Sequence, residues 1–363
     1  MKTIYKLCFG LILLTVISAG FHVQAESPPP SVAPPTDPVF VPALIYHRVI
    51  PNTTSNYDFT PEQLESHFKY LKEHGYHPIT ATQYMGFLQN PMAVPPKPVI
   101  LTFDDGNKSH YNQVFPLLKK YGFGATFFVT TDYVAEKSNT TLTWGELTEM
   151  AQSGMDIQSH TLSHPYLTAT KSFSDHAAYL KGMERELRHS KDLIEQKLQS
   201  KVDLLAYPYG WFNSEVEAIA VKVGYQGLFT VNWGNNLLTQ NPLQIKRRVM
   251  DNSLTLQDFR RILSARPLEL EAISPLDKTV IQATPVIKFR LKNSDLKTVE
   301  LIVRSFKTTL TKDNEGVFTC PSLPALTAEG YHMIIIKGTD SKNHYYLGSW
   351  GFVFHNPHVV NGD

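Results

Sequence analysis

Residues 101–106 read LTFDDG, an apolar stretch that ends in two adjacent carboxylates and a glycine. The run Val99–Phe103 is rich in branched and aromatic residues, as a buried strand should be. In a βα barrel, Asp104 and Asp105 would then lie at the strand end that faces the active site. Two neighbouring acids repel each other, so the pattern requires a bound cation or solvent. The alternative is a surface turn, because Asp-Gly is a common turn pair.

Similar apolar runs recur on both sides of this stretch and alternate with helical patterns. The runs cover residues 43–46, 125–130, 155–158, 204–207, 227–231 and 245–249. Capping boxes at Thr60 and Thr143 predict two helix starts, and residues 176–199 and 213–223 carry further helical patterns. Strand–helix alternation predicts an α/β fold with a parallel sheet, and seven or eight such units favour a barrel.

The pattern changes after Arg266. Residues 267–276 read as a linker, and short alternating strand patterns follow at 286–291, 298–303, 316–318, 332–337 and 345–354. No helical pattern of useful length interrupts them. Residues 267–363 are therefore expected to form a small all-β sandwich of the immunoglobulin or fibronectin III type.

The N-terminus resembles an export signal. Lys2 and Lys6 precede an apolar stretch that ends in Val-Gln-Ala, so residues 1–25 are expected to be a cleaved signal peptide. Residues 26–41 are rich in proline and predict an extended linker, with folded structure beginning near Pro42. We therefore expect a secreted protein with no membrane span after cleavage. The alternative is an uncleaved N-terminal anchor.

Charge and cysteine content exclude several classes of protein. The 34 basic and 33 acidic residues nearly cancel, which argues against an electrostatic nucleic-acid binder. The only cysteines are Cys8 and Cys320, so a disulfide scaffold and a four-cysteine zinc site are both excluded. Cys320 is expected to be a small core residue.

A second motif supplies two histidines. Residues 159–165 read SHTLSHP and follow the apolar run 155–158, with His160 and His164 four positions apart. Such a pair is a weak signal alone, but it gains weight beside a strand-end pair of aspartates. One aspartate and two histidines make a three-ligand site with an open position, which suits a catalytic zinc or a similar divalent ion.

A third motif, AYPYG at residues 206–210, also follows an apolar run. Pro208 fixes the backbone and Gly210 permits a turn. The turn is either a purely structural bend or a rigid element that presents a backbone N–H to an oxyanion.

These three motifs, in this order, resemble the polysaccharide deacetylases with NodB homology, the family 4 carbohydrate esterases. The resemblance covers roughly residues 42–265, and the opening ALIYHR at 43–48 resembles the branch of extracellular and cell-wall enzymes. It implies a distorted (β/α) barrel as the catalytic domain, 42–266. It also implies hydrolysis of N-acetyl groups from amino sugars of a polymer such as peptidoglycan, poly-N-acetylglucosamine or a chitin-like chain, with release of acetate.

The resemblance also implies roles for individual residues. A divalent metal ion, zinc first and cobalt or nickel as alternatives, would be bound by Asp105, His160 and His164. Asp104 would be the general base, and the Tyr209 backbone N–H would stabilise the oxyanion. Substrate contacts would come from Pro208, Tyr209 and Trp211.

The chain departs from the family pattern at two points. Many members carry an arginine at the position of Ala206 that contacts the catalytic aspartate, so this contact is expected to be missing. Many also carry a late histidine as general acid, and none occurs between residues 207 and 266. His47, at the end of an apolar strand, is the candidate substitute, with a structural histidine as the alternative. One of Arg247 and Arg248 is expected to face the site, and His110 is expected on the surface.

Aromatic residues on loops and element ends allow two interpretations. Stacking on sugar rings is one, but each residue taken separately is more typical of packing. The residues are Trp144, Tyr166, Tyr209, Trp211 and Trp233.

The sequence thus favours an exported, metal-dependent deacetylase whose partner is an N-acetylated amino-sugar polymer. The two departures motivate an alternative, a cell-wall-binding protein with this fold and little turnover. A different metallohydrolase is a third reading, but the His-x-His pair usual on the first strand of an amidohydrolase barrel is missing.

Overall fold

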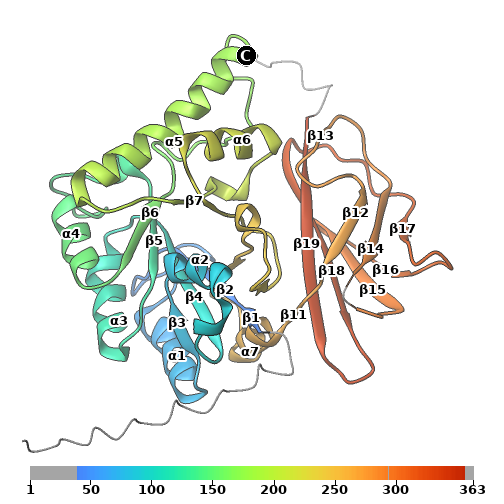
Figure 1. Ribbon diagram of the computed structural model, residues 1–363, viewed down its shortest axis with the longest axis horizontal. Coiled ribbons are helices and arrows are strands. Elements are labelled where there is room, and N and C mark those ends of the chain that lie inside the picture. The colour runs from blue at the N-terminus through green and yellow to red at the C-terminus, as the bar shows by residue number, and fades with distance from the viewer. Residues whose placement is uncertain (1–38, 293, 356–363) are drawn as a thin grey trace, which may run out of the picture. The chain divides into compact units, whose positions relative to one another are not determined.

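The computed structural model describes residues 39–292 and 294–355 (Figure 1). The expected signal peptide, Cys8 and almost all of the expected linker lie outside the described residues. Within the described ranges, no helix combines the length and the apolar character that a bilayer span requires.

Seven parallel strands form the N-terminal sheet, in the order β10-β2-β4-β5-β6-β7-β8, and β3 pairs with β4. A bridge between Phe229 and Ile245 links β8 to the segment that leads into β10, so the two ends of the strand path come together. The prediction of a distorted (β/α) barrel is confirmed. The strands are β2 (Ala43–Tyr46), β3 (His77–Ile79), β4 (Pro98–Asp105), β5 (Thr126–Val129), β6 (Asp156–Ser159), β7 (Leu204–Ala206), β8 (Gly227–Phe229) and β10 (Arg248–Val249). A separate antiparallel pair joins β1 (Phe40–Val41) to β9 (Asn236–Leu237).

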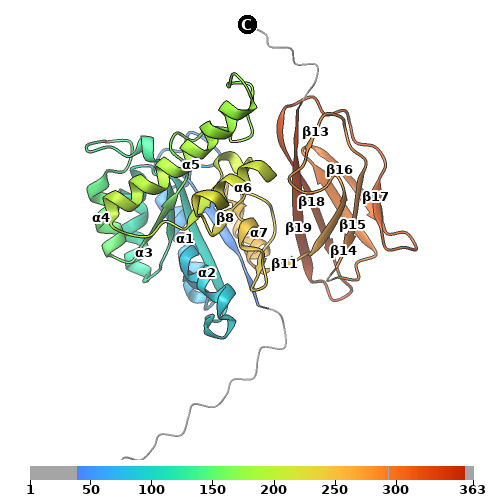
Figure 2. The same ribbon diagram turned by 45° about the horizontal axis from the view of Figure 1, so that its top comes forward.

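Seven α-helices lie around these strands (Figures 1 and 2). They are α1 (Pro61–Glu73), α2 (Ala81–Gln89), α3 (Phe115–Tyr121), α4 (Trp144–Gln152), α5 (His176–Leu198), α6 (Ser214–Val223) and α7 (Leu256–Ser264). The capping boxes expected at Thr60 and Thr143 are both formed. Short 3-10 turns occur at Pro91–Ala93, Thr131–Tyr133, Pro208–Gly210 and Pro242–Gln244, and a π-turn spans His110–Val114.

Alternation along the strands separates two hydrophobic cores. Leu101 and Phe103 of β4 point to the helix layer, whereas Ile100 of the same strand joins a cluster inside the barrel. Tyr84 of α2 belongs to that inner cluster. The same alternation turns Asp104 inward, on the face of β4 that also carries Ile100 and Thr102.

His110 is buried, so its expected surface position was wrong. Its side chain is fully buried beside the rings of Phe103 and Phe127. Its Nε2–H donates a hydrogen bond of 2.7 Å to the His47 carbonyl. Burial lowers the pKa of His110 to about 4, so the ring stays neutral. The π-turn that begins at His110 turns this side chain inward.

The C-terminal β region, β11 to β19, contains two sheets. One has the order β11-β19-β18-β15-β16 with β13 also paired to β19, and the other has the order β12-β14-β17. Side chains from both sheets share one hydrophobic core, which includes Phe289, Trp350 and Cys320. The strands are β11 (Arg266–Pro267), β12 (Leu270–Ser274), β13 (Val280–Ile281), β14 (Ile287–Leu291), β15 (Thr298–Val303), β16 (Phe306–Thr311), β17 (Phe318–Cys320), β18 (Gly330–Thr339) and β19 (Tyr345–Phe354). The expected burial of Cys320 is confirmed.

The expected linker at 267–276 was wrong. Residues 266–267 pair with β19, and Leu270–Ser274 pairs with β14. This strand is only partly buried and carries a bulge after Ala272, which weakens its alternating pattern in the sequence. The C-terminal β region therefore begins directly after α7.

We predict that His67 makes the barrel sensitive to acid. It is buried, stacks on Phe259 with ring centroids 4.0 Å apart, and hydrogen-bonds the Tyr46 hydroxyl. Burial lowers its pKa from 6.5 to about 4, so the unfolded chain takes up the proton first as pH falls. The stabilisation is complete above pH 6.5 and is lost towards pH 4, at a cost of about 2 kcal/mol between pH 7 and 5.

Urea unfolding at the two pH values tests this prediction. His67→Phe should lose about 2 kcal/mol less than the wild type between pH 7 and 5, whereas His74→Phe, at an exposed position, should behave as the wild type. Equal pH dependence in the wild type and His67→Phe would contradict it.

Candidate metal and catalytic site

The residues singled out by the three motifs meet at one edge of the barrel. Parallel pairing aligns Asp105 of β4 with Val129 of β5, and Val129 with Ser159 of β6. Since the carboxyl ends of parallel strands share an edge, Asp105 and His160 leave the sheet at the same edge, with β5 between their strands. His47 follows β2 and Tyr207 follows β7 at the same edge.

Asp105, His160 and His164, called the triad below, converge on one point. The two histidine Nε2 atoms lie 3.1 Å apart. The distances to Asp105 Oδ1 are 3.4 Å from His164 Nε2 and 3.6 Å from His160 Nε2. All three ligand atoms lie within 4.8 Å of one another. One carboxylate oxygen and two imidazole nitrogens so arranged can hold a divalent ion.

The surroundings of His160 leave the correct nitrogen available to a metal. Its Nδ1 lies 2.8 Å from the Ala206 carbonyl, which can only accept, so Nδ1 carries the hydrogen and Nε2 presents its lone pair to the triad. Burial lowers the pKa of His160 to about 4, which keeps the ring neutral. Burial also acts to raise the pKa of Asp105, but the hydrogen bond with His164 and the other neighbouring side chains outweigh it, and the net shift is downward. Both groups are therefore in their ligating forms.

Left-handed backbone conformations concentrate at this site. Nine described non-glycine residues have positive φ, and four of them are Asp105 (φ 77°), Thr161 (72°), His164 (63°) and Tyr209 (57°). Each such residue costs about 1 kcal/mol or more relative to ordinary backbone. Strain of this kind persists only where the surrounding structure enforces it, as it does here at the strand ends.

Asp104 forms a buried ion pair that the sequence did not reveal. Arg247 Nη1 donates to Asp104 Oδ1 at 2.7 Å, and Nη2 donates to Oδ2 at 2.9 Å. Arg247 is fully buried and Asp104 nearly so. Burial acts to raise the pKa of Asp104, but the positive charge of Arg247 outweighs it, and the net shift is downward. The carboxylate is therefore held in its ionised form.

The expected lack of an arginine contact was therefore wrong. Ala206 cannot provide it, but Arg247 does so from the segment that closes the barrel. Arg248, the other candidate, lies 3.5 Å from the centroid of the Trp233 ring. The paired arginines before the last strand were the available signal, but the sequence did not show which one faces inward.

The turn at Pro208–Gly210 is tightly enclosed. Tyr209 adopts φ 57° and ψ 1°. Gly210 has φ 71°, and a Cβ there would lie 2.1 Å from Val231 Cγ2, so no side chain fits. The turn is thus fixed in place, and it sets the Tyr209 ring 4.6 Å from that of His164.

Exposed aromatic rings border the triad. Tyr133, Tyr166 and Tyr209, called the aromatic wall below, are 42–48% exposed. Tyr166 stacks on Tyr209 at 4.1 Å and contacts Trp211 at 4.4 Å. Trp144 is buried, so the packing interpretation holds for it. The wall therefore retains surface for a ligand.

His47 lies close enough to the two aspartates for its charge to lower the pKa of both. Its Nδ1 is buried and has no hydrogen-bond partner within the described ranges. Its ring centroid is 5.7 Å from that of Tyr57, which is 54% exposed. The fold thus brings His47 to the metal site, as expected.

Comparison with known proteins agrees with this geometry. Residues 92–228 match the family model described as polysaccharide deacetylase. The protein YxkH of Bacillus subtilis (strain 168), provisionally named a polysaccharide deacetylase, is 31% identical over 189 residues, which cover 52% of this chain and 63% of YxkH. A deacetylase from Streptococcus pyogenes, PplD, superimposes with a TM-score of 0.57 at 27% identity, covering 62% of this chain and 99% of PplD.

Residues 92–228 of the chain are thus similar to the polysaccharide deacetylases. A further relative, the poly-beta-1,6-N-acetyl-D-glucosamine N-deacetylase of Escherichia coli (strain K12), is 27% identical over 249 residues. That match covers 59% of this chain but only 37% of the relative. The chain thus spans less than two thirds of the length of these two curated relatives.

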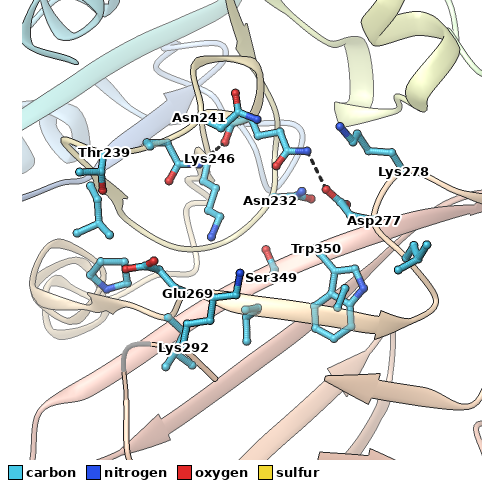
Figure 3. Close-up of a pocket in the computed structure, with 18 residues that line it drawn as sticks. Asn232, Thr239, Asn241, Lys246, Glu269, Asp277, Lys278, Lys292, Ser349 and Trp350 are labelled. Atoms are coloured by element: carbon cyan, nitrogen blue, oxygen red, sulfur yellow. Dashed lines mark hydrogen bonds between the residues drawn. The ribbon is translucent and has the colours of Figure 1, made fainter. Parts of the chain in front are cut away.

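A separate cavity lies away from the triad. It measures about 500 Å³ and lies between residues 232–246 and the C-terminal β region (Figure 3). Gln244 donates a 2.9 Å hydrogen bond to Asp277 at its border. Neither Asp104 nor any triad residue is among its lining residues. The triad and Asp104 therefore lie outside this cavity, at the strand ends.

Removal of Arg247 should destabilise the fold. Arg247→Met would leave the Asp104 carboxylate buried without a counter-charge, which costs about 3–5 kcal/mol. The matched control, Arg248→Met, removes a contact with Trp233 worth about 1 kcal/mol and leaves no buried carboxylate without its bidentate partner. Urea unfolding at pH 7 measures both losses. Equal, small losses would show that the buried pair does not stabilise the barrel.

Proposed function

We propose that the protein is a metal-dependent N-deacetylase of an acetylated amino-sugar polymer. The triad, with an ionised aspartate immediately beside it, carries this proposal. The similarity of residues 92–228 to the polysaccharide deacetylases and the names of the relatives support it. The reaction is hydrolysis of an acetamide, which yields acetate and a free amine.

The triad residues would hold the ion, with Asp105 providing an oxygen and His160 and His164 each providing Nε2. A divalent ion at this place would make water a better nucleophile and polarise the acetyl carbonyl. Neutral imidazoles and a carboxylate suit zinc, which we propose as the ion, with cobalt or nickel as alternatives.

Asp104 is the proposed general base. Its side chain faces the triad, with Oδ2 3.9 Å from His160 Nε2. The Arg247 charge keeps the carboxylate ionised and its bidentate hydrogen bonds fix its orientation, so it can accept a proton from the attacking water. The backbone N–H of Tyr209 is the proposed donor to the oxyanion of the tetrahedral intermediate.

His47 is the proposed general acid. The amine must gain a proton as the C–N bond breaks, and a histidine near the site is suited to donate it. The buried Nδ1 without a partner and the electrostatic coupling to Asp104 and Asp105 support this role. Asp104 takes one proton from the attacking water, and His47 gives one proton to the amine. Transfer of the proton from Asp104 to His47 would then restore both side chains, so the cycle balances.

The aromatic wall supports a sugar substrate, because exposed rings beside the triad offer stacking surfaces. We propose Pro208, Tyr209 and Trp211 as substrate-binding residues, with Pro208 and Trp211 acting mainly through the shape of the turn. The printed name of the E. coli relative assigns poly-beta-1,6-N-acetyl-D-glucosamine to that protein. Peptidoglycan and chitin-like chains are the other candidates for this one.

We also propose the organisation expected from the sequence, with a signal peptide at 1–25, a linker at 26–41, a catalytic domain at 42–266 and a β domain at 267–363. Such a protein would act outside the bacterial cell or in its wall. The alternative is a wall-binding protein with little turnover. One of its two supporting arguments, the missing arginine contact to Asp104, no longer holds, because Arg247 makes that contact.

Substitutions in the triad and at Asp104 should separate metal binding from turnover. Asp105→Ala and His160→Ala should each lose the metal and the activity. Asp104→Asn should keep a full equivalent of metal and lose turnover by about 10²–10⁴-fold, as for a missing general base. Metal analysis of the purified proteins and acetate release from N-acetylglucosamine oligomers and whole peptidoglycan measure the two properties. Near-normal turnover in Asp104→Asn would overturn the assignment of the base.

The role of His47 should depend on the leaving group. His47→Ala should lower hydrolysis of N-acetyl sugars by about 10²–10⁴-fold, because the amine leaves only after protonation. Hydrolysis of 4-nitrophenyl acetate should fall far less, because its phenolate leaves without a proton. His189→Ala, on the exposed side of α5, is the matched control and should behave as the wild type. Equal losses on both substrates would assign His47 to structure instead.

A further inference from the structure

Trp211 packs directly against the backbone of Gly330, the first residue of β18. A Cβ at Gly330 would lie 2.0 Å from Cη2 and 2.3 Å from Cζ2 of the Trp211 ring. These separations are far inside van der Waals contact, so the ring occupies the space that any side chain would need. Gly330 also has φ 109°, which favours glycine.

A series of rings connects this contact to the triad. Trp211 lies 4.4 Å from Tyr166, which stacks on Tyr209 at 4.1 Å, and Tyr209 lies 4.6 Å from His164. Trp211 also follows the Pro208–Gly210 turn directly in the chain. A displacement of its ring would therefore reach both the aromatic wall and the turn.

The residues on either side of Gly330 hold two other loops of the barrel. Glu329 forms an ion pair with Lys171, which lies in the loop between β6 and α5, and the Lys171 Nζ to Glu329 Oε2 distance is 2.8 Å. The Tyr331 hydroxyl donates a hydrogen bond of 2.9 Å to Oδ1 of Asn232, which lies in the loop after β8. The Tyr331 ring also packs on Phe212, with centroids 5.4 Å apart.

Residues 329–331 thus contact the loops that follow β6, β7 and β8, and both Gly330 and Tyr331 lie against the loop after β7. These three strands are neighbours in the sheet, and the loops after β6 and β7 carry His164 and Tyr209. Electrostatic, steric and hydrogen-bonding contacts are combined in three consecutive residues. Such a segment restricts the loops relative to one another.

We propose that residues 329–331 of the C-terminal β region are positioning residues for the reaction. They fix the Pro208–Gly210 turn and the aromatic wall, and so place the acetamide relative to Asp104 and the triad. This inference rests on the proposed deacetylase function. None of the three residues touches reacting atoms, and a misplacement of about 1 Å at such a site can cost about 100-fold in rate.

Gly330→Ala tests the contact with Trp211. We expect kcat on an N-acetylglucosamine oligomer to fall about 10–100-fold, while the protein keeps one equivalent of zinc, because the triad ligands come from other segments. Gly316→Ala is the matched control, since Gly316 also has positive φ in the C-terminal β region but nothing within 4 Å of a Cβ. It should keep wild-type kcat.

A double-mutant cycle with Trp211→Ala separates positioning from general destabilisation. Without the indole ring, the three atoms nearest to the added methyl group are gone, so Gly330→Ala should cost little further activity in the Trp211→Ala background. Backbone strain at φ 109° would remain in both backgrounds. A loss that is equally large in both would overturn the proposal.

Tyr331→Phe provides a second test should Gly330→Ala not fold. It removes only the hydroxyl that bonds Asn232, and we expect a several-fold loss of kcat with normal zinc content. Unchanged kcat in the folded variants would overturn the inference while wild-type activity upholds the deacetylase. If the wild type released no acetate from any polymer, the proposed function would fail instead. Near-UV circular dichroism would then decide the inference: a Trp211 signal altered by Gly330→Ala but not by Gly316→Ala would support the contact, and an unaltered one would refute it.

Discussion

The buried ion pair between Asp104 and Arg247 links the fold to the chemistry. Ile245 bridges to β8 and Arg248 pairs with β2, so the segment that carries Arg247 is the one that closes the barrel. When the barrel closes, the guanidinium of Arg247 therefore lies inside it, next to Asp104. Either charge alone would be costly inside a low-dielectric barrel, so neither side chain is tolerable there without the other. The same ion pair therefore requires the barrel to close correctly and keeps the aspartate beside the triad ionised.

The triad depends on that constraint for its geometry. Asp105 directly follows Asp104 and leaves the strand with a left-handed backbone, so the fixed position of Asp104 also fixes where Asp105 points. His160 follows β6 and is oriented by the carbonyl of Ala206 at the end of the neighbouring strand β7. His164 is oriented by its own left-handed backbone conformation. The ligands are thus oriented by backbone contacts of neighbouring strands and loops, which do not require the ion. Preorganisation of this kind reduces the cost of ordering ligands when a metal binds.

Local features were predictable from the sequence and distant pairings were not. Strand ends, capping boxes and a site of one strand-end aspartate and two histidines follow from sequence motifs, the family resemblance selected Asp105 as that aspartate, and the structure brings these residues together. The partner of Asp104 is more than a hundred positions away, and a two-residue strand gave too little pattern to show which arginine faces inward. The inward turn of His110 depends on a π-turn, and β12 was missed because its half-buried strand lacks clear alternation.

Trp211 shows why substrate contact and packing were hard to distinguish from sequence. One side of its indole covers Gly330 and another lies against Tyr166, so the residue both packs and shapes the exposed wall. An aromatic residue with these two contacts transmits the position of one part of the chain to another, because a rigid ring cannot yield to one neighbour without pressing on the other. The same reasoning applies to Tyr331, whose ring joins the barrel core while its strand belongs to the β region. A C-terminal β region attached in this way holds the aromatic side chains that border the triad.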